Sequence, residues 1–158
     1  MNDLEDTVLN LPPCSLQLRE YMGVRQVYDP LRHRWIAYTP EERVRQRFVG
    51  YLIKDLLYPG GRIGNEVSIA LNGTRKRCDT VIYDGNGLPL AVIEYKAPGV
   101  SINRAVFDQI LRYSLVLGNR FIFVSNGMEH YCAQINRGIN PSLVFLNSIP
   151  AYTDLSKL

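Results

Sequence analysis

Hydrophobic residues recur at every fourth position between residues 44 and 56, a period that places them on one face of an amphipathic helix. The recurring residues are Val44, Phe48, Leu52 and Leu56. Before them, Thr39 suits an N-cap, Pro40 suits the first helical position, and Glu42 stands where a capping box requires an acid. Because Pro59-Gly60-Gly61 stops the pattern, we predict a first helix that begins after Thr39 and ends before Pro59.

Three shorter patterns follow this helix and are typical of β-strands. They cover residues 66–71, 77–83 and 88–96. The sequence DGNG at residues 84–87 is a turn that joins the second pattern to the third. We therefore predict an antiparallel meander of three strands.

A second helix and two further strands are predicted after the meander. Residues 101–117 carry apolar positions at helical spacing, and Gly118 stands where a C-cap glycine belongs. The apolar run FIFV at residues 121–124 is typical of a strand that is buried on both faces. Asn126-Gly127 is a turn signal before a partner strand at residues 130–135.

The order of these elements predicts the fold class. The strand from residue 88, the helix from residue 101 and the strand from residue 120 form a βαβ unit, so those two strands should run parallel. The whole order is αβββαβ, which we interpret as an α/β fold, in the broader sense an α+β arrangement with a mixed central sheet flanked by helices. Residues 1–40 show little periodicity and are predicted to be an N-terminal arm with short strands around 24–28 and 35–38, so residues 41–158 form the single domain.

Length and composition limit the class of protein without choosing a function. A chain of 158 residues with 46% hydrophobic residues suits one globular domain, and a net charge of +3 permits a polyanionic partner without requiring one. The cysteines, at positions 14, 78 and 132, form no CxxC pair, which favours reduced thiols and a cytoplasmic location. No apolar run is long enough to span a membrane, and we expect no membrane partner.

The candidate chemistry lies where the most apolar strand ends, in the sequence AVIEYKAP. Glu94 and Lys96 are two residues apart on a strand and therefore point to the same face. If the preceding turn pairs Tyr83 with Leu88, Asp79 lies on that face as well, one diagonal step from Glu94. A shift of the register by one residue would move Asp79 to the opposite face.

Two interpretations of these charges remain open from the residues alone. Two converging carboxylates offer oxygen ligands for a hard cation such as Mg²⁺ or Mn²⁺. A surface ion pair between Lys96 and Glu94 is the simpler interpretation, since such pairs are common and contribute little. The apolar run before Glu94 favours the first, because a charge at the end of a buried strand costs free energy unless it has a use.

The spacing of these residues resembles a known nuclease motif. Asp79, 14 intervening residues and then Glu94-Tyr95-Lys96 resemble the D…(D/E)xK motif of the PD-(D/E)xK nucleases, whose core has a similar αβββαβ order. Gln109 and Tyr113 resemble the Q-x-x-x-Y helix motif of one branch of that superfamily. More narrowly, GTRKRCDTVIYD, AVIEYKAP, DQILRYS and SNGMEHYC together resemble the N-terminal domain of type I restriction enzyme R subunits, over about residues 28–152.

The resemblance implies a role for each matching residue. Asp79 and Glu94 would hold Mg²⁺ or Mn²⁺ with the backbone carbonyl of Tyr95, where the family often has cysteine. Lys96 would orient the attacking water, so Asp79, Glu94 and Lys96 would be the catalytic residues. Gln109 and Tyr113 would be accessory residues, with ordinary helix packing as the alternative.

Two further acids and a group of basic residues complete the candidate site. Either Glu66 or Glu42 could add a third metal ligand, as related nucleases often use an acid from the first helix or strand. Glu42 is otherwise explained by the capping box, and Glu66 by a solvated strand end. Basic residues near the acids suit a phosphate backbone, with solubility as the alternative. These candidate nucleic-acid contacts are Arg75, Lys76, Arg77, Arg43 and Arg47.

Taken with the resemblance, these residues predict a metal-dependent endonuclease domain that hydrolyses DNA phosphodiester bonds. The alternatives are a catalytically inactive DNA- or protein-binding module on the same fold, and a structural protein whose charges form surface ion pairs. The sequence has no G-x-x-x-x-G-K-[S/T] stretch and therefore no P-loop; if it belongs to an ATP-driven restriction complex, we expect that the motor is on another chain or was lost. The expected partners are DNA and either other restriction–modification subunits or a second copy of the chain.

Overall fold

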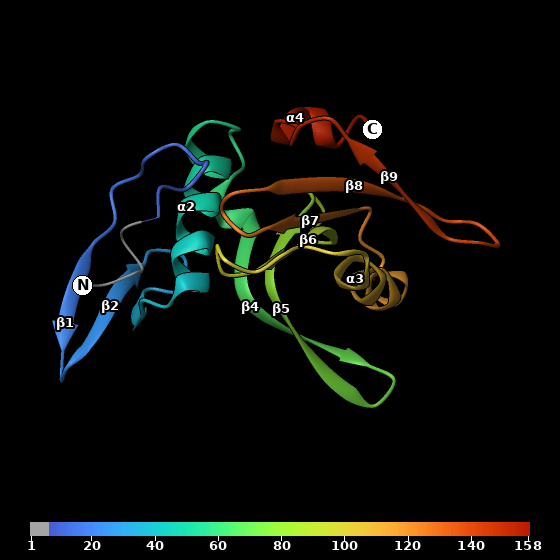
Figure 1. Ribbon diagram of the computed structural model, residues 1–158. Coiled ribbons are helices and arrows are strands. Elements are labelled where there is room, and N and C mark those ends of the chain that lie inside the picture. The colour runs from blue at the N-terminus through green and yellow to red at the C-terminus, as the bar shows by residue number, and fades with distance from the viewer. Residues whose placement is uncertain (1–6) are drawn as a thin grey trace.

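The strands of the protein form two separate sheets (Figure 1). The computed structural model describes residues 7–158. The first sheet is antiparallel and contains β1 (Leu18–Tyr21), β2 (Val24–Asp29) and β3 (Arg34–Ala37). It lies in the region that was predicted to be an arm, and β2 and β3 confirm the two short strands expected there. The division of the chain at residue 40 remains a prediction.

The second sheet has six strands in the order β4-β5-β6-β7-β8-β9. Its strands are β4 (Ile63–Leu71), β5 (Thr74–Tyr83), β6 (Pro89–Tyr95), β7 (Phe121–Ser125), β8 (His130–Asn136) and β9 (Ser142–Leu146). The pair β6–β7 is parallel and the other neighbours are antiparallel. The crossover between β6 and β7 contains α3 (Arg104–Leu117), so the predicted βαβ unit and mixed sheet are confirmed.

The first helix, α2 (Pro40–Lys54), begins where its cap predicts. The hydroxyl of Thr39 accepts a hydrogen bond from the N–H of Glu42 at 3.1 Å, with Pro40 in the first turn. The reciprocal half of the predicted capping box is wrong, because the N–H of Thr39 donates to the carbonyl of Ala37 instead. The carboxylate of Glu42 is therefore available for other partners.

The second helix begins three residues later than predicted. Asn103 caps α3 by accepting a hydrogen bond from the N–H of Val106 at 3.3 Å, and the helix starts at Arg104. Gly118 ends it in the left-handed conformation at φ 89°, as its position indicated. All five residues of β7 are buried, which confirms a strand covered on both faces.

Two hydrophobic cores cover the two faces of the six-stranded sheet. Ala91, Ile93 and Tyr95 of β6 face the core that contains α2, and the short helix α4 (Tyr152–Leu155) adds to that core. Val92 faces the core that contains α3. The sheet is thus a middle layer between helices (Figure 1). None of the helices within residues 7–158 is long and apolar enough to cross a membrane.

The segment before β1 packs on the α2 side of the sheet. Leu9 and Leu11 belong to the core around α2. The N–H of Asn10 donates to the carbonyl of Gly127 at 2.8 Å. A Cβ atom at Gly127 would lie 2.9 Å from the side chain of Leu9 and 3.1 Å from that of Val44, and its φ is +84°. Glycine is therefore required where the N-terminal segment crosses the β7–β8 turn.

The β5–β6 register differs from the predicted one. Tyr83 pairs with Pro89 and Val81 pairs with Val92, with a register shift between Ile82 and Tyr83. The predicted pairing of Tyr83 with Leu88 is wrong because it treats the connection as a regular hairpin, whereas an irregularity displaces the strands. The displacement changes the partner of Asp79 but not the face that it shares with Glu94.

Candidate active site

The two predicted carboxylates meet where β5 and β6 stop pairing. Thr80 pairs with Ile93, and the same register places Asp79 directly opposite Glu94 rather than on a diagonal. At this point the side chain of Asp79 replaces a ladder bond: its Oδ2 accepts a hydrogen bond from the N–H of Tyr95 at 2.9 Å. Glu94 thus lies near the end of β6, while Asp79 lies within β5 and is fixed by the main chain of the neighbouring strand.

Burial and nearby negative charges set the electrostatics of the pair. Burial, and then the charge of Asp79, raise the pKa of Glu94 to about 7, although Lys76 and Lys96 act in the opposite direction. Burial is also the largest cause of the raised pKa of Asp79, which the Tyr95 hydrogen bond and Arg45 only partly offset. Oε2 of Glu94 is buried and has no hydrogen-bond partner. The nearby positive charges therefore compensate the burial of the pair only in part.

Lys96 lies immediately after β6, beside the carboxylates. Its N–H donates to the carbonyl of Ser125 at 2.9 Å, so the chain continues along β7 past the last residue of the strand. The ammonium group lowers the pKa of Glu94, but Lys76 has the larger effect. Lys76 was predicted only as a nucleic-acid contact, and the structure also places it near Glu94.

Glu66 is the third acid in this row. It lies between the pairs Asn65–Thr80 and Val67–Cys78, opposite Asp79, and its φ of 56° is unusual for a residue with a side chain. Its Oε1 lies 2.5 Å from the guanidinium of Arg45. Its Oε2 lies 3.6 Å from Nε of Arg77. Glu66 is thus near the carboxylate pair but is occupied by arginines.

Glu42 is buried within a different set of contacts. Its Oε1 accepts hydrogen bonds from Arg32 at 2.6 Å and from Gln46 at 3.0 Å. Its Oε2 lies 3.4 Å from Nε of Arg45. These contacts explain its burial without a metal ion, and a role as a ligand remains a prediction.

The two helix residues of the Q-x-x-x-Y spacing differ in their environment. Tyr113 is buried, its hydroxyl has no hydrogen-bond partner, and Nζ of Lys76 lies 5.2 Å from the centre of its ring. Burial, and then the charge of Glu94, raise the pKa of Tyr113. Gln109, one turn earlier, is exposed. Tyr113 therefore borders the candidate site from α3, and the accessory role of both residues remains a prediction.

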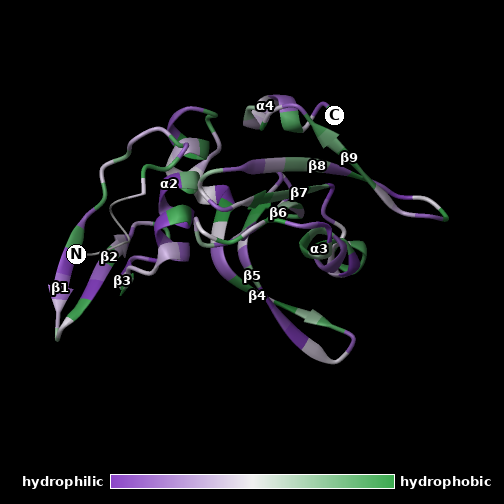
Figure 2. Cartoon of the chain, viewed as in Figure 1, coloured by the Kyte–Doolittle hydropathy of each residue, from purple (hydrophilic) through white to green (hydrophobic). Residues whose placement is uncertain are grey.

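The predicted nucleic-acid contacts fall into two groups. Arg75, Lys76 and Arg77 lie on the β4–β5 hairpin, and the side chain of Arg77 is 69% exposed. Figure 2 shows this hydrophilic stretch of β5 opposite the more hydrophobic end of β4. Arg43 donates to the carbonyl of Thr7 at 2.7 Å, and Arg47 to that of Leu11 at 2.8 Å.

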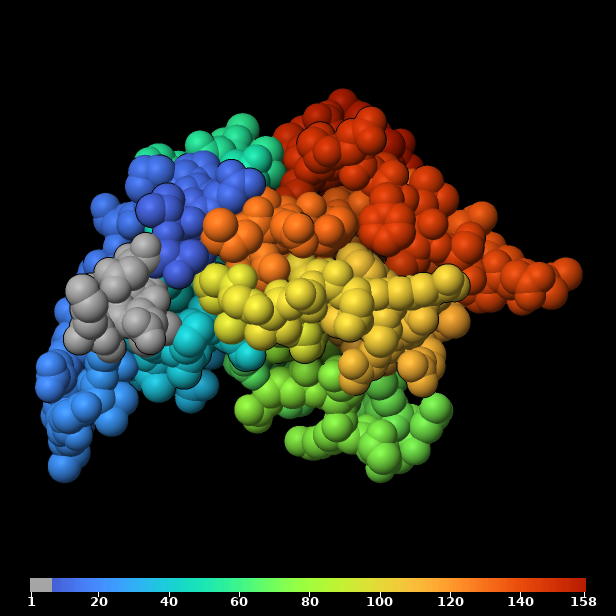
Figure 3. Space-filling model, viewed as in Figure 1, coloured from blue at the N-terminus to red at the C-terminus, as the bar shows by residue number. Residues whose placement is uncertain are grey.

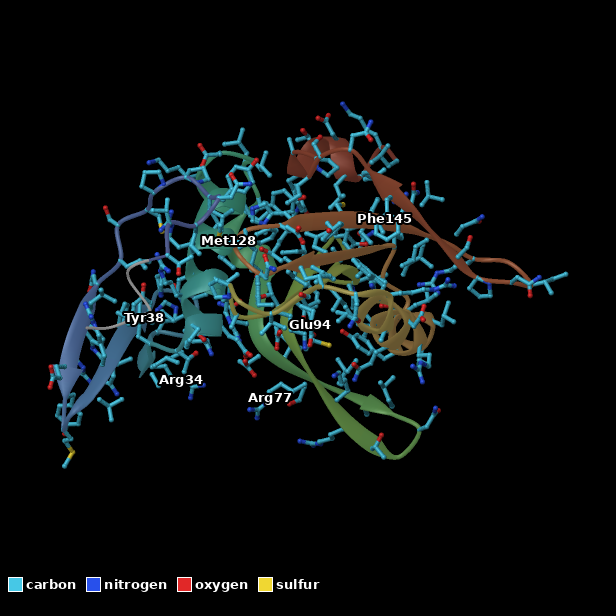
Figure 4. The ribbon with its side chains drawn as sticks, viewed as in Figure 1. Arg34, Tyr38, Arg77, Glu94, Met128 and Phe145 are labelled. Atoms are coloured by element: carbon cyan, nitrogen blue, oxygen red, sulfur yellow. The ribbon has the colours of Figure 1, made fainter. Side chains whose placement is uncertain are left out.

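The hairpin residues remain accessible to a ligand, while Arg43 and Arg47 hold the N-terminal segment against α2. The β4–β5 hairpin projects on the same side of the molecule as the first sheet (Figure 3). In the side-chain view, Arg77 lies below Glu94 on that side (Figure 4). A ligand bound to the hairpin would therefore be close to the candidate site.

Arg45 is the site residue that the sequence reasoning missed. It lies on α2 between the candidate contacts Arg43 and Arg47, and its side chain is only 6% exposed. Phe48, Val49 and Leu52 follow it at three, four and seven residues, and all three are buried. That spacing already placed Arg45 beside the buried stripe of the helix.

The donor set fits a hard cation at the carboxylate pair. Within residues 7–158, no group of three or more His, Cys, Asp or Glu residues is gathered as a ready metal cluster. Asp79 and Glu94 nevertheless face each other with raised pKa values, and one buried oxygen of Glu94 has no partner. A divalent cation would compensate both charges and use the free oxygen.

The candidate site thus combines Asp79 of β5 with Glu94 and Lys96 at the end of β6, in the middle of a mixed sheet. The model of the family described as type I restriction enzyme R protein N terminus (HSDR_N) matches residues 40–150. The chain therefore belongs to this family. No curated protein matches the chain.

Two solved structures are similar to the chain. The fragment structure of a putative HsdR subunit of a type I restriction enzyme from Vibrio vulnificus YJ016 matches with a TM-score of 0.56 and 20% identity, over 74% of this chain and 24% of that one. The DrdV–DNA complex matches with a TM-score of 0.42 and 20% identity, over 75% of this chain and 12% of that one. The first likeness shows the fold. The chain spans about a quarter of the length of the HsdR fragment.

Proposed function

We propose that this domain is a metal-dependent endonuclease that hydrolyses DNA phosphodiester bonds. The observation that carries the proposal is the carboxylate pair, in which Asp79 lies close enough to Glu94 to raise its pKa and a buried oxygen of Glu94 has no hydrogen-bond partner. A structural ion pair would have matched each carboxylate with a cation. A site whose negative charge is not fully compensated is suited to bind a cation.

Each residue of the candidate site has its own role in the proposed reaction. Asp79 and Glu94 would hold Mg²⁺ or Mn²⁺, with the carbonyl of Tyr95 as a further donor. When bound, the cation supplies a Lewis acid and lowers the pKa of water. Lys96 orients the attacking water and offsets negative charge on the phosphorus centre. Tyr113 is buried and close enough to Glu94 for that charge to raise its pKa, and it would support the acids as an accessory residue.

Family membership supports DNA as the substrate and a restriction system as the context. The exposed Arg75 and Arg77 would contact the phosphate backbone, since contacts of this kind hold a duplex in place without reading its sequence. We propose further that the domain works with other restriction–modification subunits or as a homodimer.

A plasmid-nicking assay tests the proposal. The wild-type protein should nick supercoiled DNA with Mg²⁺ or Mn²⁺ and should be inactive with EDTA. Lys96→Ala should abolish nicking while Mn²⁺ binding is retained, because Lys96 is not a ligand. Equal nicking by the variant would remove Lys96 from the mechanism. DNA binding without any nicking would support the inactive binding module instead.

A salt titration of DNA binding tests the proposed contacts. Replacing Arg75, Lys76 and Arg77 with alanine should weaken binding to all sequences alike. The slope of log K against log salt should fall by up to ~1 for each lost phosphate contact. Lys157→Ala is the control, since Lys157 follows α4 on the opposite side of the molecule from the hairpin (Figure 1). An unchanged slope in the triple variant would show that the hairpin does not face DNA.

A further inference from the structure

Charged side chains of alternating sign form a continuous chain of ion pairs, which we call the relay. Its members, in order, are Asp29, Arg32, Glu42, Arg45, Glu66 and Arg77. The N–O distances along it are 2.6 Å from Arg32 to Glu42, 3.4 Å from Glu42 to Arg45, and 2.5 Å from Arg45 to Glu66. The relay therefore leads from the first sheet, through α2, to the strand that carries Asp79.

Arg45 is the member of the relay that touches the candidate site. One terminal nitrogen of its guanidinium donates to the carbonyl of Asp79 at 3.0 Å, and the other binds the carboxylate of Glu66. The guanidinium also lies 5.7 Å from the centre of the Tyr95 ring. A single buried side chain thus contacts three neighbouring strands, β4, β5 and β6.

The contact with Asp79 is made to the main chain, so the carboxylate of Asp79 remains available. Because that carboxylate also accepts the N–H of Tyr95, Asp79 is held on both its carbonyl and its side chain. Glu66 is in the opposite situation, since both of its oxygens are engaged by arginines. The guanidinium of Arg45 therefore holds Asp79 by its backbone carbonyl and Glu66 by its carboxylate.

We propose that Arg45 is a positioning residue of the candidate cation site, which fixes Asp79 through its main chain and keeps the carboxylate of Glu66 away from the cation. This inference rests on the proposed function, because it assumes that Asp79 and Glu94 hold a cation. It reduces the predicted set of three acids to two. Glu66 then belongs to the relay and is not a ligand.

The geometry of the guanidinium makes arginine necessary at this position. A planar fork can donate to the carbonyl of Asp79 and to Glu66 at once, while Nε remains near Glu42. A lysine carries the same charge on a single nitrogen and cannot span these acceptors. Arg45→Lys therefore removes the fork and keeps the charge, so a change in cation affinity cannot be assigned to a lost positive charge.

The relay also connects the first sheet to the candidate site. Asp29 of β2 binds Arg32, and its Oδ2 also accepts a hydrogen bond from Nδ2 of Asn65 on β4 at 3.1 Å. Oδ1 of Asn65 accepts from the hydroxyl of Thr80, which is adjacent to Asp79, at 2.7 Å. The first sheet lies outside residues 40–150, where the family model matches. It is nevertheless connected to β4 through Asn65 and, through the Asn65–Thr80 hydrogen bond, to β5, the strand that carries Asp79.

The test is the Mn²⁺ dissociation constant of four proteins, measured by calorimetric titration well below their melting temperatures. The proteins are the wild type, Arg45→Lys, Glu66→Gln and the control Arg43→Lys. Arg43 is another buried arginine of α2, and it contacts the carbonyl of Thr7 rather than the site. Loss of a contact that holds a metal ligand in place commonly costs ~10-fold to ~100-fold in metal affinity. We expect at least ~10-fold weaker binding for Arg45→Lys, and less than ~2-fold change for Glu66→Gln and the control.

Melting temperatures in EDTA separate positioning from general support of the fold. A merely structural Arg45 would lower the melting temperature of Arg45→Lys but leave the Mn²⁺ affinity of the folded protein unchanged, and that result would overturn the inference. A loss of ~10-fold or more in Glu66→Gln would also overturn it, since Glu66 would then be a ligand. If the wild type binds no Mn²⁺, the proposed function and the inference fail together. If it binds Mn²⁺ and Arg45→Lys binds equally well, the inference alone fails.

Discussion

The relay and the carboxylate pair lie next to each other, yet the pKa values of Asp29 in the relay and Asp79 in the pair shift in opposite directions. In the relay, Asp29 is 1% exposed, but hydrogen bonds from Arg32 and Asn65 outweigh its burial and lower its pKa. At the pair, burial outweighs the favourable contacts of Asp79 and raises its pKa. Asp29 is the less exposed of the two and still has the lowered pKa, so the difference arises from the partners of the two aspartates and not from their exposure.

The comparison shows which of the two regions holds the fold together. Removing one member of a satisfied ion pair leaves a buried charge without a partner, which destabilises the protein strongly. Removing one of two like charges relieves a repulsion. The relay should therefore be sensitive to substitution, whereas the carboxylate pair should tolerate it in stability and fail only in cation binding.

The largest expected effect comes from breaking the relay at Glu42. Glu42→Gln keeps the shape of the side chain but leaves Arg32 and Arg45 without their shared negative partner. We expect a loss of about 3 kcal/mol in the free energy of unfolding, measured by urea denaturation in EDTA. Glu20→Gln is the matched control because Glu20 lies on the exposed strand β1, and it should change stability by less than about 0.5 kcal/mol. Equal effects in both variants would contradict the distinction between the regions.

The next effect is the response of the carboxylate pair to a cation. A ligand that binds the native state at 100 times its dissociation constant stabilises it by about 2.7 kcal/mol. Excess Mn²⁺ should therefore raise the melting temperature of the wild type, and EDTA should reverse the rise. Glu94→Gln should lose most of this response, and Glu129→Gln, a control remote from the pair in sequence, should keep it. A wild type that shows no shift with Mn²⁺ would exclude a cation site in the native state.

The sequence predicted the elements well because their signals are local. The Thr39 cap, the glycine at 118 and the apolar run at 121–124 each depend on residues within one turn or one strand. The convergence of Asp79 and Glu94 was also correct, since alternation along a strand determines the face. Their exact opposition was not predictable, because the irregularity after Ile82 leaves no signature in the DGNG turn.

The partners of the charges depend on tertiary contacts and were largely missed. Arg45 and Glu66 are 21 residues apart in the sequence, and neither has a local pattern that identifies the other. Glu42 had a complete local explanation in the capping box, but its carboxylate is used by Arg32, ten residues earlier. Long-range pairing overrides a local preference when it satisfies a buried charge.

The pH dependence of stability in EDTA should reveal the raised pKa of Glu94. The pKa is about 7 in the folded protein and 4.5 in the reference state, so the folded state binds the proton more tightly. This contribution to stability is fully present below the lower value and is lost as the pH rises through the upper one. Relative to Glu94→Gln, the wild type should lose on the order of 2 kcal/mol between about pH 5 and about pH 8. A difference between the two proteins that is constant across this range would refute the shift.

The smallest expected change in stability is that of Asp79→Asn, and its sign distinguishes a cation site from a structural ion pair. Asp79→Asn removes one of the two facing charges and keeps an oxygen that can accept the N–H of Tyr95. Because burial and the neighbouring carboxylates disfavour the charge of Asp79 more than Arg45 favours it, the metal-free variant should be more stable than the wild type by on the order of 1 kcal/mol. Asp108→Asn is the control, since Asp108 forms only an exposed pair with Arg104, and it should change stability by less than about 0.5 kcal/mol. Thermal melts in EDTA and in excess Mn²⁺ measure both proteins, and Asp79→Asn should also lose the Mn²⁺ response. If Asp79→Asn instead melts lower in EDTA, Asp79 is half of a structural ion pair, and the carboxylate pair belongs with the relay.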